Sequence, residues 1–329
     1  MRYSLKDVPA GRLDLKDRTF RVTEWEGPEK ARLLERSIET MGLLNPPAAL
    51  PGDGGSWRIV CGFKRIEACR SLGIKEIRVR ALSGKPDPLD LARWAIADNS
   101  FSRPLNLLER ANAAALLFRS LKEAGAGEEN LEKEAGALGL PGNSGVLADL
   151  QRVYFLPDSI KQKILSGRIS LAMAVRLSAL NREEAETFAE IFDTLRLGLN
   201  RQKEFLLLAK EIAIREDIGV RDVFSDPEFL DITGPEDGKD LPIQTKNARL
   251  YLQKRRFPAL SKAREDFAEN LKQLHLSAGA SIAAPPFFEG NRYILHLPFS
   301  KKQDIREHQK TLDSLAENPA LETFPGFKP

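Results

Sequence analysis

Residues 57–73 constrain the fold of this chain more than any other segment. Their sequence, Trp-Arg-Ile-Val-Cys-Gly-Phe-Lys-Arg-Ile-Glu-Ala-Cys-Arg-Ser-Leu-Gly, predicts a strand, a turn and a helix that ends at a glycine. Gly62 permits both a sharp turn and the close approach of a ligand. Lys64 and Arg65 follow near the start of the helix, where free backbone N–H groups and the helix dipole favour an anion. The pattern outlines a phosphate site, and a surface turn with solvated charges fits it equally well.

The neighbouring segments complete a small α+β domain. Apolar residues recur with helical spacing over residues 29–41, and Gly42 ends that helix. The other expected elements are strands at 48–50, 57–61 and 77–82 and a helix at 66–72. We assign residues 1–100 to this domain.

Helical patterns dominate after residue 88. The expected helices are 89–98, 106–124, 130–138, 144–155, 158–166, 171–179, 182–196 and 200–215. These elements predict an all-α domain over residues 101–223. The segment 224–243 is polar and rich in Pro and Gly, which is typical of a linker.

Residues 244–329 are expected to form a small α+β carboxy-terminal domain, to which the sequence gives no role. The expected elements are helices at 244–255, 258–274 and 301–316 and strands near 280–284 and 291–297, with a turn at Glu289-Gly-Asn291.

Composition and charge narrow the function classes. The net charge of +3 excludes a uniformly basic coat. Residues 1–80 nevertheless carry 16 Lys and Arg against 11 Asp and Glu, which permits contact with a nucleic acid. No apolar run is long enough to cross a bilayer, and the first residues have no signal-peptide core. The two cysteines, Cys61 and Cys69, do not have metal-ligand spacing, so we expect a cytoplasmic protein without a membrane partner.

The segment Asp98-Asn-Ser-Phe-Ser-Arg103 is a second candidate site. The side-chain oxygens of Asp98 and Asn99 suit a hard cation such as Mg²⁺. The guanidinium of Arg103 suits bidentate binding of a phosphate. Because Asp, Asn and Ser also favour helix ends, simple capping is the alternative interpretation.

Residues 131–156 have the pattern of a helix-turn-helix. Gly139 opens the turn, and Leu147, Leu150 and Tyr154 are expected to form the inward face of the second helix. Such a helix can lie in the major groove and contact base edges, although an ordinary helical hairpin has the same pattern. The residues left to point outward are Asn143, Ser144, Asp149 and Arg152.

Four segments, in this order, resemble the conserved boxes of ParB-type partition proteins. Gly62-Phe-Lys-Arg65 stands at the family's Gly-Glu-Arg-Arg box, and Asp98-Asn-Ser-Phe-Ser-Arg103 stands at its Glu-Asn-Leu-Gln-Arg box. The four segments are residues 33–46, 59–68, 98–109 and 147–174. The resemblance covers roughly residues 1–180. It identifies the chain as a divergent member, with a ParB/sulfiredoxin-like amino-terminal domain followed by a helix-turn-helix.

The resemblance implies a CTP-gated DNA clamp that acts in plasmid or chromosome partition. Proteins of this family bind CTP with Mg²⁺ and close on DNA after the helix-turn-helix has loaded them at a specific site. Slow CTP hydrolysis acts as the switch. The resemblance also implies a homodimer, a nucleoid-associated location and a ParA-type ATPase as a partner.

The implied sites follow residue by residue from the matching boxes. Asp98 and Asn99 would face Mg²⁺ and the triphosphate. The implied nucleotide site consists of Gly42, Leu43, Gly62, Phe63, Lys64, Arg65, Asp98, Asn99 and Arg103. The implied DNA contacts are Asn143, Ser144, Asp149 and Arg152.

Departures from the family pattern keep other functions open. Phe63 stands where the family has Glu, and Phe101 and Ser102 replace Gln and Arg of the third box. These changes favour an alternative in which a DNA-binding transcriptional regulator keeps the fold without nucleotide turnover. A nuclease of the ParB-like class is another alternative, but the clustered carboxylates of two-metal cleavage are missing. A sulfiredoxin-like enzyme would need a cysteine at position 63.

Overall fold

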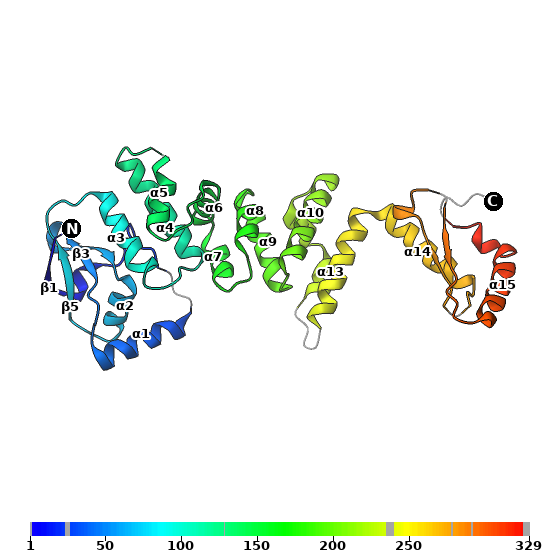
Figure 1. The fold of residues 1–329 in the computed structure, drawn as a ribbon, viewed down its shortest axis with the longest axis horizontal. Coiled ribbons are helices and arrows are strands. Elements are labelled where there is room, and N and C mark those ends of the chain that lie inside the picture. The colour runs from blue at the N-terminus through cyan, green and yellow to red at the C-terminus, as the bar shows by residue number, and fades with distance from the viewer. Residues whose placement is uncertain are drawn as a thin grey trace. The chain divides into compact units, whose positions relative to one another are not determined.

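The computed structural model describes residues 2–23, 27–127, 129–234, 240–277, 279–290 and 292–324 (Figure 1). The chain separates into two compact units, Met1–Lys203 and Glu204–Pro329. No helix within the described ranges is long and apolar enough to span a membrane. The division into two units does not test the domain boundaries expected at residues 100, 223 and 243, which stay predictions.

The first unit begins with a mixed five-stranded sheet whose strand order is β1-β5-β3-β4-β2. Its strands are β1 (Tyr3–Pro9), β2 (Leu13–Asp14), β3 (Ala48–Pro51), β4 (Trp57–Cys61) and β5 (Glu76–Leu82). β1 pairs with β5 and β3 pairs with β4 in antiparallel fashion, whereas β3–β5 and β2–β4 are parallel. The strands β3, β4 and β5 confirm the sequence expectation. The sequence pattern missed β1 because its side chains lie exposed with little alternation.

Three helices belong to this part of the fold: α1 (Pro28–Met41), α2 (Phe63–Ser71) and α3 (Pro88–Ser100). α1 ends at Gly42, as expected. α2 begins at Phe63, earlier than the expected residue 66, because the Phe63 side chain is buried in the same core cluster as Ile59 and Ile66. The basic residues that follow Phe63 therefore lie within the first turn of the helix.

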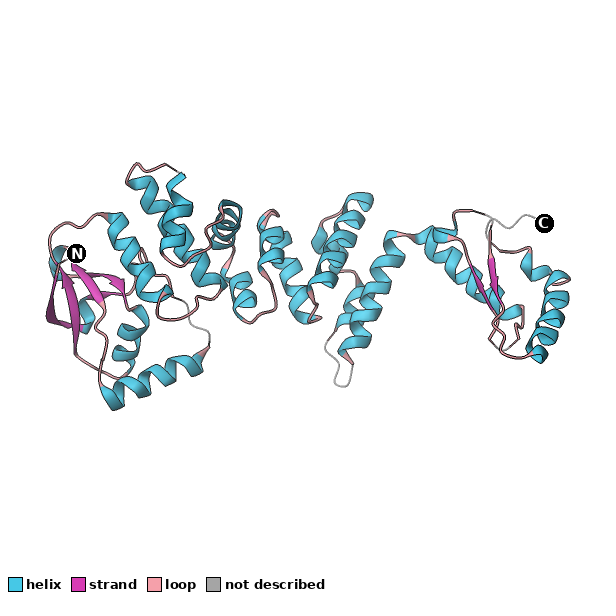
Figure 2. Cartoon of the chain, viewed as in Figure 1, coloured by secondary structure: helices cyan, strands magenta, loops and turns pink. Residues whose placement is uncertain are grey.

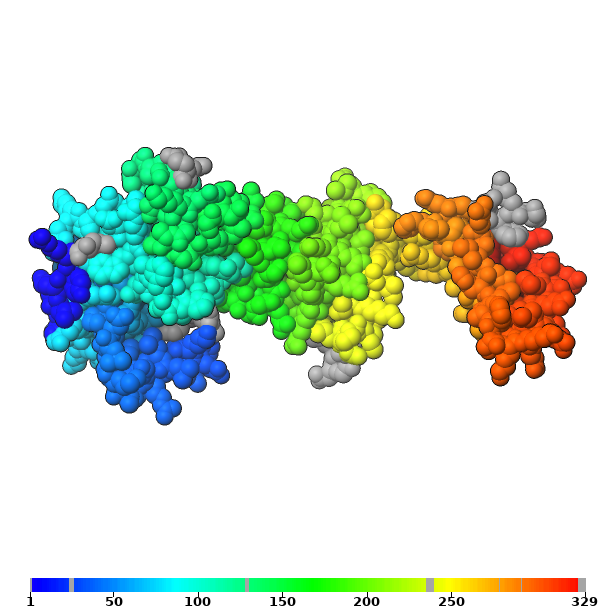
Figure 3. Space-filling view, in the orientation of Figure 1, coloured from blue at the N-terminus to red at the C-terminus, as the bar shows by residue number. Residues whose placement is uncertain are grey.

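The rest of the first unit is helical (Figure 2). Its helices are α4 (Leu107–Glu123), α5 (Glu129–Ala137), α6 (Ser144–Tyr154), α7 (Asp158–Leu165), α8 (Leu171–Ser178), α9 (Arg182–Thr194) and the start of α10 (Leu199–Glu216). Several begin after an Asn or Ser whose side chain accepts a backbone N–H of the first turn, which fixes the helix start. These caps are Asn106, Asn143, Ser170 and Asn181. The helical expectations for this region are confirmed, and the space-filling view shows the blue, cyan and green residues as one continuous surface (Figure 3).

The second unit adds further helices and a two-stranded sheet. Its elements are α11 (Val220–Phe224), α12 (Pro227–Thr233), α13 (Leu241–Arg256), α14 (Pro258–Gln273), β6 (Ser281–Ala283), β7 (Ile294–His296) and α15 (Lys302–Ala316). Short 3-10 turns lie at Ala10–Arg12, Asp53–Gly55, Pro286–Phe288 and Pro319–Leu321.

Part of the expected linker is a helix. α12 lies within 224–243 because Phe229 is fully buried, with ring centroids 5.2 Å from Phe224 and 5.7 Å from Tyr251. Residues 227–233 therefore form a helix, although the Pro and Gly content of residues 224–243 is typical of a linker. Residues 235–239, and Asn291 of the expected turn, lie outside the described residues.

Candidate functional site

Gly62 makes the turn that joins β4 to α2. Its φ of 88° and ψ of 25° are left-handed, a conformation that side chains rarely adopt. A Cβ atom at this position would lie 2.6 Å from the Cβ of Pro47, so the turn also has no room for one. Glycine is therefore required here both by the backbone angle and by the close packing against the chain that enters β3.

Asp98 binds two arginines at once. Its Oδ2 accepts a hydrogen bond from Nη2 of Arg65 at 2.6 Å, and its Oδ1 accepts one from Nη2 of Arg80 at 3.1 Å. The three side chains are between 10% and 17% exposed, which makes the cluster largely buried. The same arginines donate to the carbonyls of Asn45 and Pro46. This ion cluster therefore ties α2, α3 and β5 to the loop after α1.

Glu109 is the carboxylate of a second cluster. It is fully buried, and it forms ion pairs with Lys64 at 3.3 Å and with Arg103. It also closes a capping box with Asn106 at the start of α4. Burial alone would raise the pKa of Glu109, but the hydrogen bonds from Arg103 and from the Asn106 backbone, with the charge of Lys64, hold that pKa below its ordinary value.

The predicted nucleotide residues fall into two groups in the structure. Gly62, Lys64 and Arg65 lie at the start of α2, with Asp98 and Arg103 in the ion clusters beside them. Gly42 ends α1 with a φ of 72°, and Leu43 packs against the core of the sheet domain.

Two of the predicted nucleotide-binding residues, Phe63 and Asn99, have side chains that already make contacts within the protein. Phe63 is 2% exposed and packs in the core, with the guanidinium of Arg21 5.6 Å from its ring centroid. Only its backbone can face a ligand. Asn99 donates its side-chain amide to the Ala95 carbonyl at 2.7 Å, within its own helix.

The described side chains do not by themselves fit a Mg²⁺ site. Both oxygens of Asp98 accept hydrogen bonds from arginines. In the part of the chain that the structure describes, no group of three or more His, Cys, Asp and Glu has a metal-binding arrangement. Mg²⁺ usually takes one or two carboxylates together with substrate phosphates. Any Mg²⁺ here would depend on ligands that these side chains do not supply.

The Cys61 thiol lies below the arginine cluster. It is 1% exposed, and its Sγ lies 3.7 Å from Nη2 of Arg80. Burial, together with the charge of Asp98, raises the pKa of Cys61 to about 11. The protonated, buried thiol is a poor nucleophile, which argues against a thiol-based redox enzyme.

α5 and α6 form the expected helical pair. The Asn143 side chain accepts the N–H of Val146 at 3.1 Å and so begins α6. The N–H of Ser144 donates to Oε1 of Glu132 at 2.7 Å, which fixes the start of α6 against α5. The buried face of α6 consists of Leu147, Leu150 and Val153. Val153 is buried, whereas Tyr154, which was expected on the inward face, is only half-buried, with Nζ of Lys161 5.5 Å from its ring centroid.

The outward face of α6 has balanced charge. Asn143, Ser144 and Arg152 are exposed, as expected, and Asp149 is partly exposed. Nη1 of Arg152 donates to Oδ1 of Asp149 at 3.1 Å. The one basic side chain of this face is therefore paired with an acid on the same helix.

The sequence interpretation missed Arg80 and the role of Glu109. Glu109 had a signal, because Asn106 followed three residues later by Glu before an apolar run is a capping box. Arg80 had none, since a charged residue in an alternating strand normally faces solvent.

The fold thus defines a class of protein in which a small α+β domain with a basic glycine turn is followed along the chain by a helical pair like a helix-turn-helix. No protein-family model matches the chain. It is 25% identical over 226 residues to the chromosome-partitioning protein ParB of Myxococcus xanthus, a match that covers 68% of this chain and 66% of that protein. It is 25% identical over 193 residues to a nucleoid occlusion protein of Listeria monocytogenes, covering 57% of this chain and 64% of that protein.

A solved structure matches as well. The C-terminally truncated ParB of Caulobacter crescentus, crystallised with CTP-γ-S, is 23% identical, with a TM-score of 0.27 over 58% of this chain and 99% of that chain. The chain spans slightly less than two thirds of the length of the two curated relatives. With the four ordered segments, these sequence matches support the resemblance to ParB-type proteins, as a divergent member.

Proposed function

We propose that the chain is a partition-type DNA-binding protein whose sheet domain binds CTP at the Gly62 turn. The observation that carries this proposal is the pairing of Lys64 and Arg65, in the first turn of α2, with carboxylates from α3 and α4. A helix start with two cations favours phosphate oxygens. In the structure these cations are paired with the carboxylates of Asp98 and Glu109, with which an anionic ligand would compete.

In this proposal the nucleotide acts by exchanging ion pairs. Phosphate oxygens would compete with Asp98 for Arg65 and with Glu109 for Lys64. Because Asp98 lies in the last turn of α3 and Glu109 in the first turn of α4, release of both carboxylates would free the connection between these helices. A ligand that binds the released state better shifts the population toward it, which is what a gate requires. Mg²⁺ belongs to this proposal through the family resemblance, with phosphate oxygens as its ligands.

DNA binding would use the exposed side of α6. Asn143, Ser144 and Arg152 lie on the exposed surface of this helix, where base edges and phosphates can be reached. The name of the Myxococcus relative, a chromosome-partitioning protein, supports a role in partition. The homodimer, the nucleoid-associated location and a ParA-type ATPase partner belong to the same proposal and rest on the family resemblance.

The test is CTP binding by the full chain, with and without duplex DNA, in the presence of Mg²⁺. The double variant Lys64→Ala, Arg65→Ala should weaken CTP binding at least about tenfold, since each lost charge-assisted contact costs on the order of 1.5–3 kcal/mol. The matched control is the double variant Arg58→Ala, Arg78→Ala. It removes two cations from strands β4 and β5 of the same domain, and both side chains are more than half exposed. The proposal fails if the wild-type chain binds no nucleotide at high protein concentration under either condition.

A DNA-binding regulator without nucleotide turnover is the second candidate. It is favoured by the burial of Phe63 and by the carboxylate partners that Lys64 and Arg65 already have. In that case the double variant would bind DNA like the wild type, and CTP would change neither protein. A two-metal nuclease gains no support, because the described residues contain no cluster of metal-binding carboxylates.

A further inference from the structure

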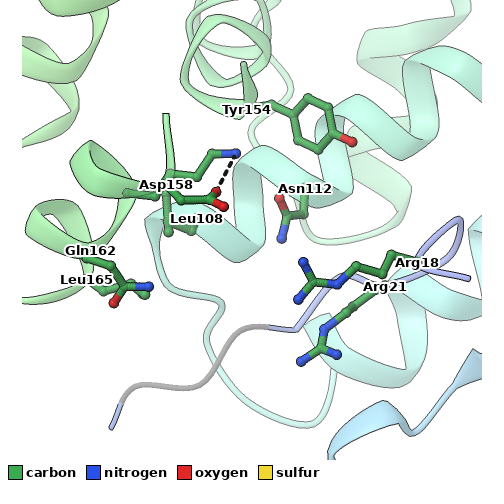
Figure 4. A pocket seen from close by; sticks show the side chains of 9 residues that line it. Arg18, Arg21, Leu108, Asn112, Tyr154, Asp158, Gln162 and Leu165 are labelled. Atoms are coloured by element: carbon green, nitrogen blue, oxygen red, sulfur yellow. Dashed lines mark ion pairs between the residues drawn. The ribbon is translucent and has the colours of Figure 1, made fainter. Parts of the chain in front are cut away.

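A basic pocket whose lining shares no residue with the candidate nucleotide site lies in the first unit (Figure 4). Its volume is about 260 Å³. The segment after β2 lines one side, and α4, the end of α6 and α7 line the others. The described lining residues are Arg18, Arg21, Leu108, Asn112, Tyr154, Asp158, Lys161, Gln162 and Leu165. We call this space the Arg18 pocket.

A turn places the two arginines of the Arg18 pocket together. The N–H of Arg21 donates to the Arg18 carbonyl at 3.0 Å, which closes the turn. The turn is anchored to α4, because Arg119 donates to the Thr19 carbonyl at 2.6 Å and Asn112 donates to the Val22 carbonyl at 3.2 Å. Figure 4 shows both guanidinium groups on the same side of this segment. The pocket wall is therefore held in place by side chains of α4 that donate to its backbone carbonyls.

The cations of the pocket differ in how far they are neutralised. Arg21 is 7% exposed and forms an ion pair with Glu67 at 2.6 Å. Lys161 lies 3.7 Å from Asp158, whose side chain is 95% exposed, so this pair is weak. Arg18 is exposed and forms no ion pair among the described residues. Asp158 is the one carboxylate in the described lining, which leaves an excess of positive charge.

We propose that the Arg18 pocket binds a phosphate group. Arg18 supplies a planar guanidinium with free donors, and Lys161 supplies an ammonium from the opposite wall. Arg21, whose charge is offset by Glu67, holds the wall beside Arg18, and the amide side chain of Gln162 offers a neutral donor. Asp158 opposes binding by charge repulsion. The ring of Tyr154, 5.5 Å from Nζ of Lys161, keeps that ammonium beside the end of α6.

The position of the pocket gives the bound phosphate a mechanical role. Arg18 belongs to the segment that leaves the sheet, whereas Lys161 belongs to α7, which follows α6 directly. A phosphate held by both would bridge the segment after β2 to α7, the helix that follows the helical pair. The phosphate could belong to a small phosphorylated ligand or to a DNA backbone, and these two sources are separable by experiment.

The first experiment measures inorganic pyrophosphate binding to the full chain by calorimetry at constant ionic strength. Arg18→Gln and Lys161→Gln should each weaken binding by about threefold to tenfold, because each removes a charge-assisted contact. Asp158→Asn should strengthen binding by about twofold to fivefold, since it removes the opposing charge. Arg182→Gln is the control, because Arg182 is a 79% exposed arginine on α9. A change that strengthens binding cannot be explained by misfolding.

The second experiment measures binding to a short duplex DNA over a range of salt concentrations. If the phosphate comes from DNA, Arg18→Gln and Lys161→Gln lower DNA affinity and reduce the salt dependence by about one counterion each. If it comes from a small ligand, the same variants lose pyrophosphate affinity and keep normal DNA binding. The proposal is overturned if Arg18→Gln and Lys161→Gln bind pyrophosphate as Arg182→Gln does, or if Asp158→Asn fails to strengthen pyrophosphate binding. CTP binding at the Gly62 turn is measured separately, and neither outcome of these experiments decides it.

Discussion

Arg65 and Asp98 are joined by a hydrogen-bonded ion pair of 2.6 Å between Nη2 and Oδ2, which links the first turn of α2 to the last turn of α3. Asp98 accepts a second hydrogen bond from Arg80, so a single carboxylate satisfies two guanidinium groups. The cations of the candidate site are therefore paired with a carboxylate of the chain itself. The contribution of these ion pairs to the free energy of unfolding can be measured without a ligand.

Asp98→Asn should destabilise the fold strongly. The change leaves Arg65 and Arg80 without a charged partner in a largely buried cluster, a loss of about 3 kcal/mol. Urea unfolding checks the free energy. Asp90→Asn is the control, since the Asp90–Arg93 pair is 50% and 38% exposed and should contribute less than about 1 kcal/mol. Equal effects of the two variants would contradict a buried role for Asp98.

Glu109→Gln should remove a pH dependence of the stability of the fold. The pKa of Glu109 in the folded chain lies below its ordinary value, so the ionised form stabilises the fold above that ordinary pKa. This contribution is lost as the pH falls through the folded-state pKa. Gln keeps the capping box but carries no charge. We expect the variant to be less stable at neutral pH and the difference to shrink below about pH 4.5, which thermal unfolding at several pH values measures. A difference that is the same at every pH would disprove the charged role.

Gly62→Ala should destabilise more than Gly73→Ala. Both glycines have left-handed φ angles, 88° and 72°, so both changes introduce similar backbone strain. A Cβ at Gly62 meets Pro47 at 2.6 Å, whereas a Cβ at Gly73 meets nothing within 4 Å. We expect about 1 kcal/mol for Gly73→Ala and about 2–3 kcal/mol for Gly62→Ala. Chemical denaturation gives both values, and equal losses would show that the Pro47 contact relaxes without cost.

Arg152→Gln and Asp149→Asn should change DNA affinity in opposite directions. The two side chains form one ion pair on the exposed side of α6, so loss of the arginine removes a phosphate partner and loss of the acid removes a repulsion. Fluorescence anisotropy with a duplex at fixed salt measures both, with Arg78→Gln, a change at a 62% exposed arginine on β5, as the control. If neither variant differs from that control, DNA does not contact this side of α6.

Much of the fold could be predicted from the sequence because its signals are local. The strands β3, β4 and β5 and most helices follow from apolar periodicity and from caps such as Asn106 and Asn143. β1 was missed because it depends on pairing with β5 across about seventy residues, which no local pattern records. α12 was missed because the burial of Phe229 outweighs the loop-like composition around it.

The candidate site was predictable only in part, and for a similar reason. Gly62, Lys64 and Arg65 lie in one short motif, so their grouping needs no tertiary contact. The carboxylate partners of those cations come from two other elements, α3 and α4, which only folding brings together. Sequence patterns therefore identified Lys64, Arg65, Asp98 and Arg103 but left out Arg80 and the role of Glu109, which complete the two ion clusters.

The burial of both cysteines has a practical consequence for following motion in this chain. Cys61 and Cys69 are each 1% exposed, and burial raises the pKa of both thiols. The native chain should therefore react slowly with maleimide reagents. A single cysteine introduced at exposed Ser144 or Arg18 could carry a fluorophore with little background, and no native residue would need to be removed first.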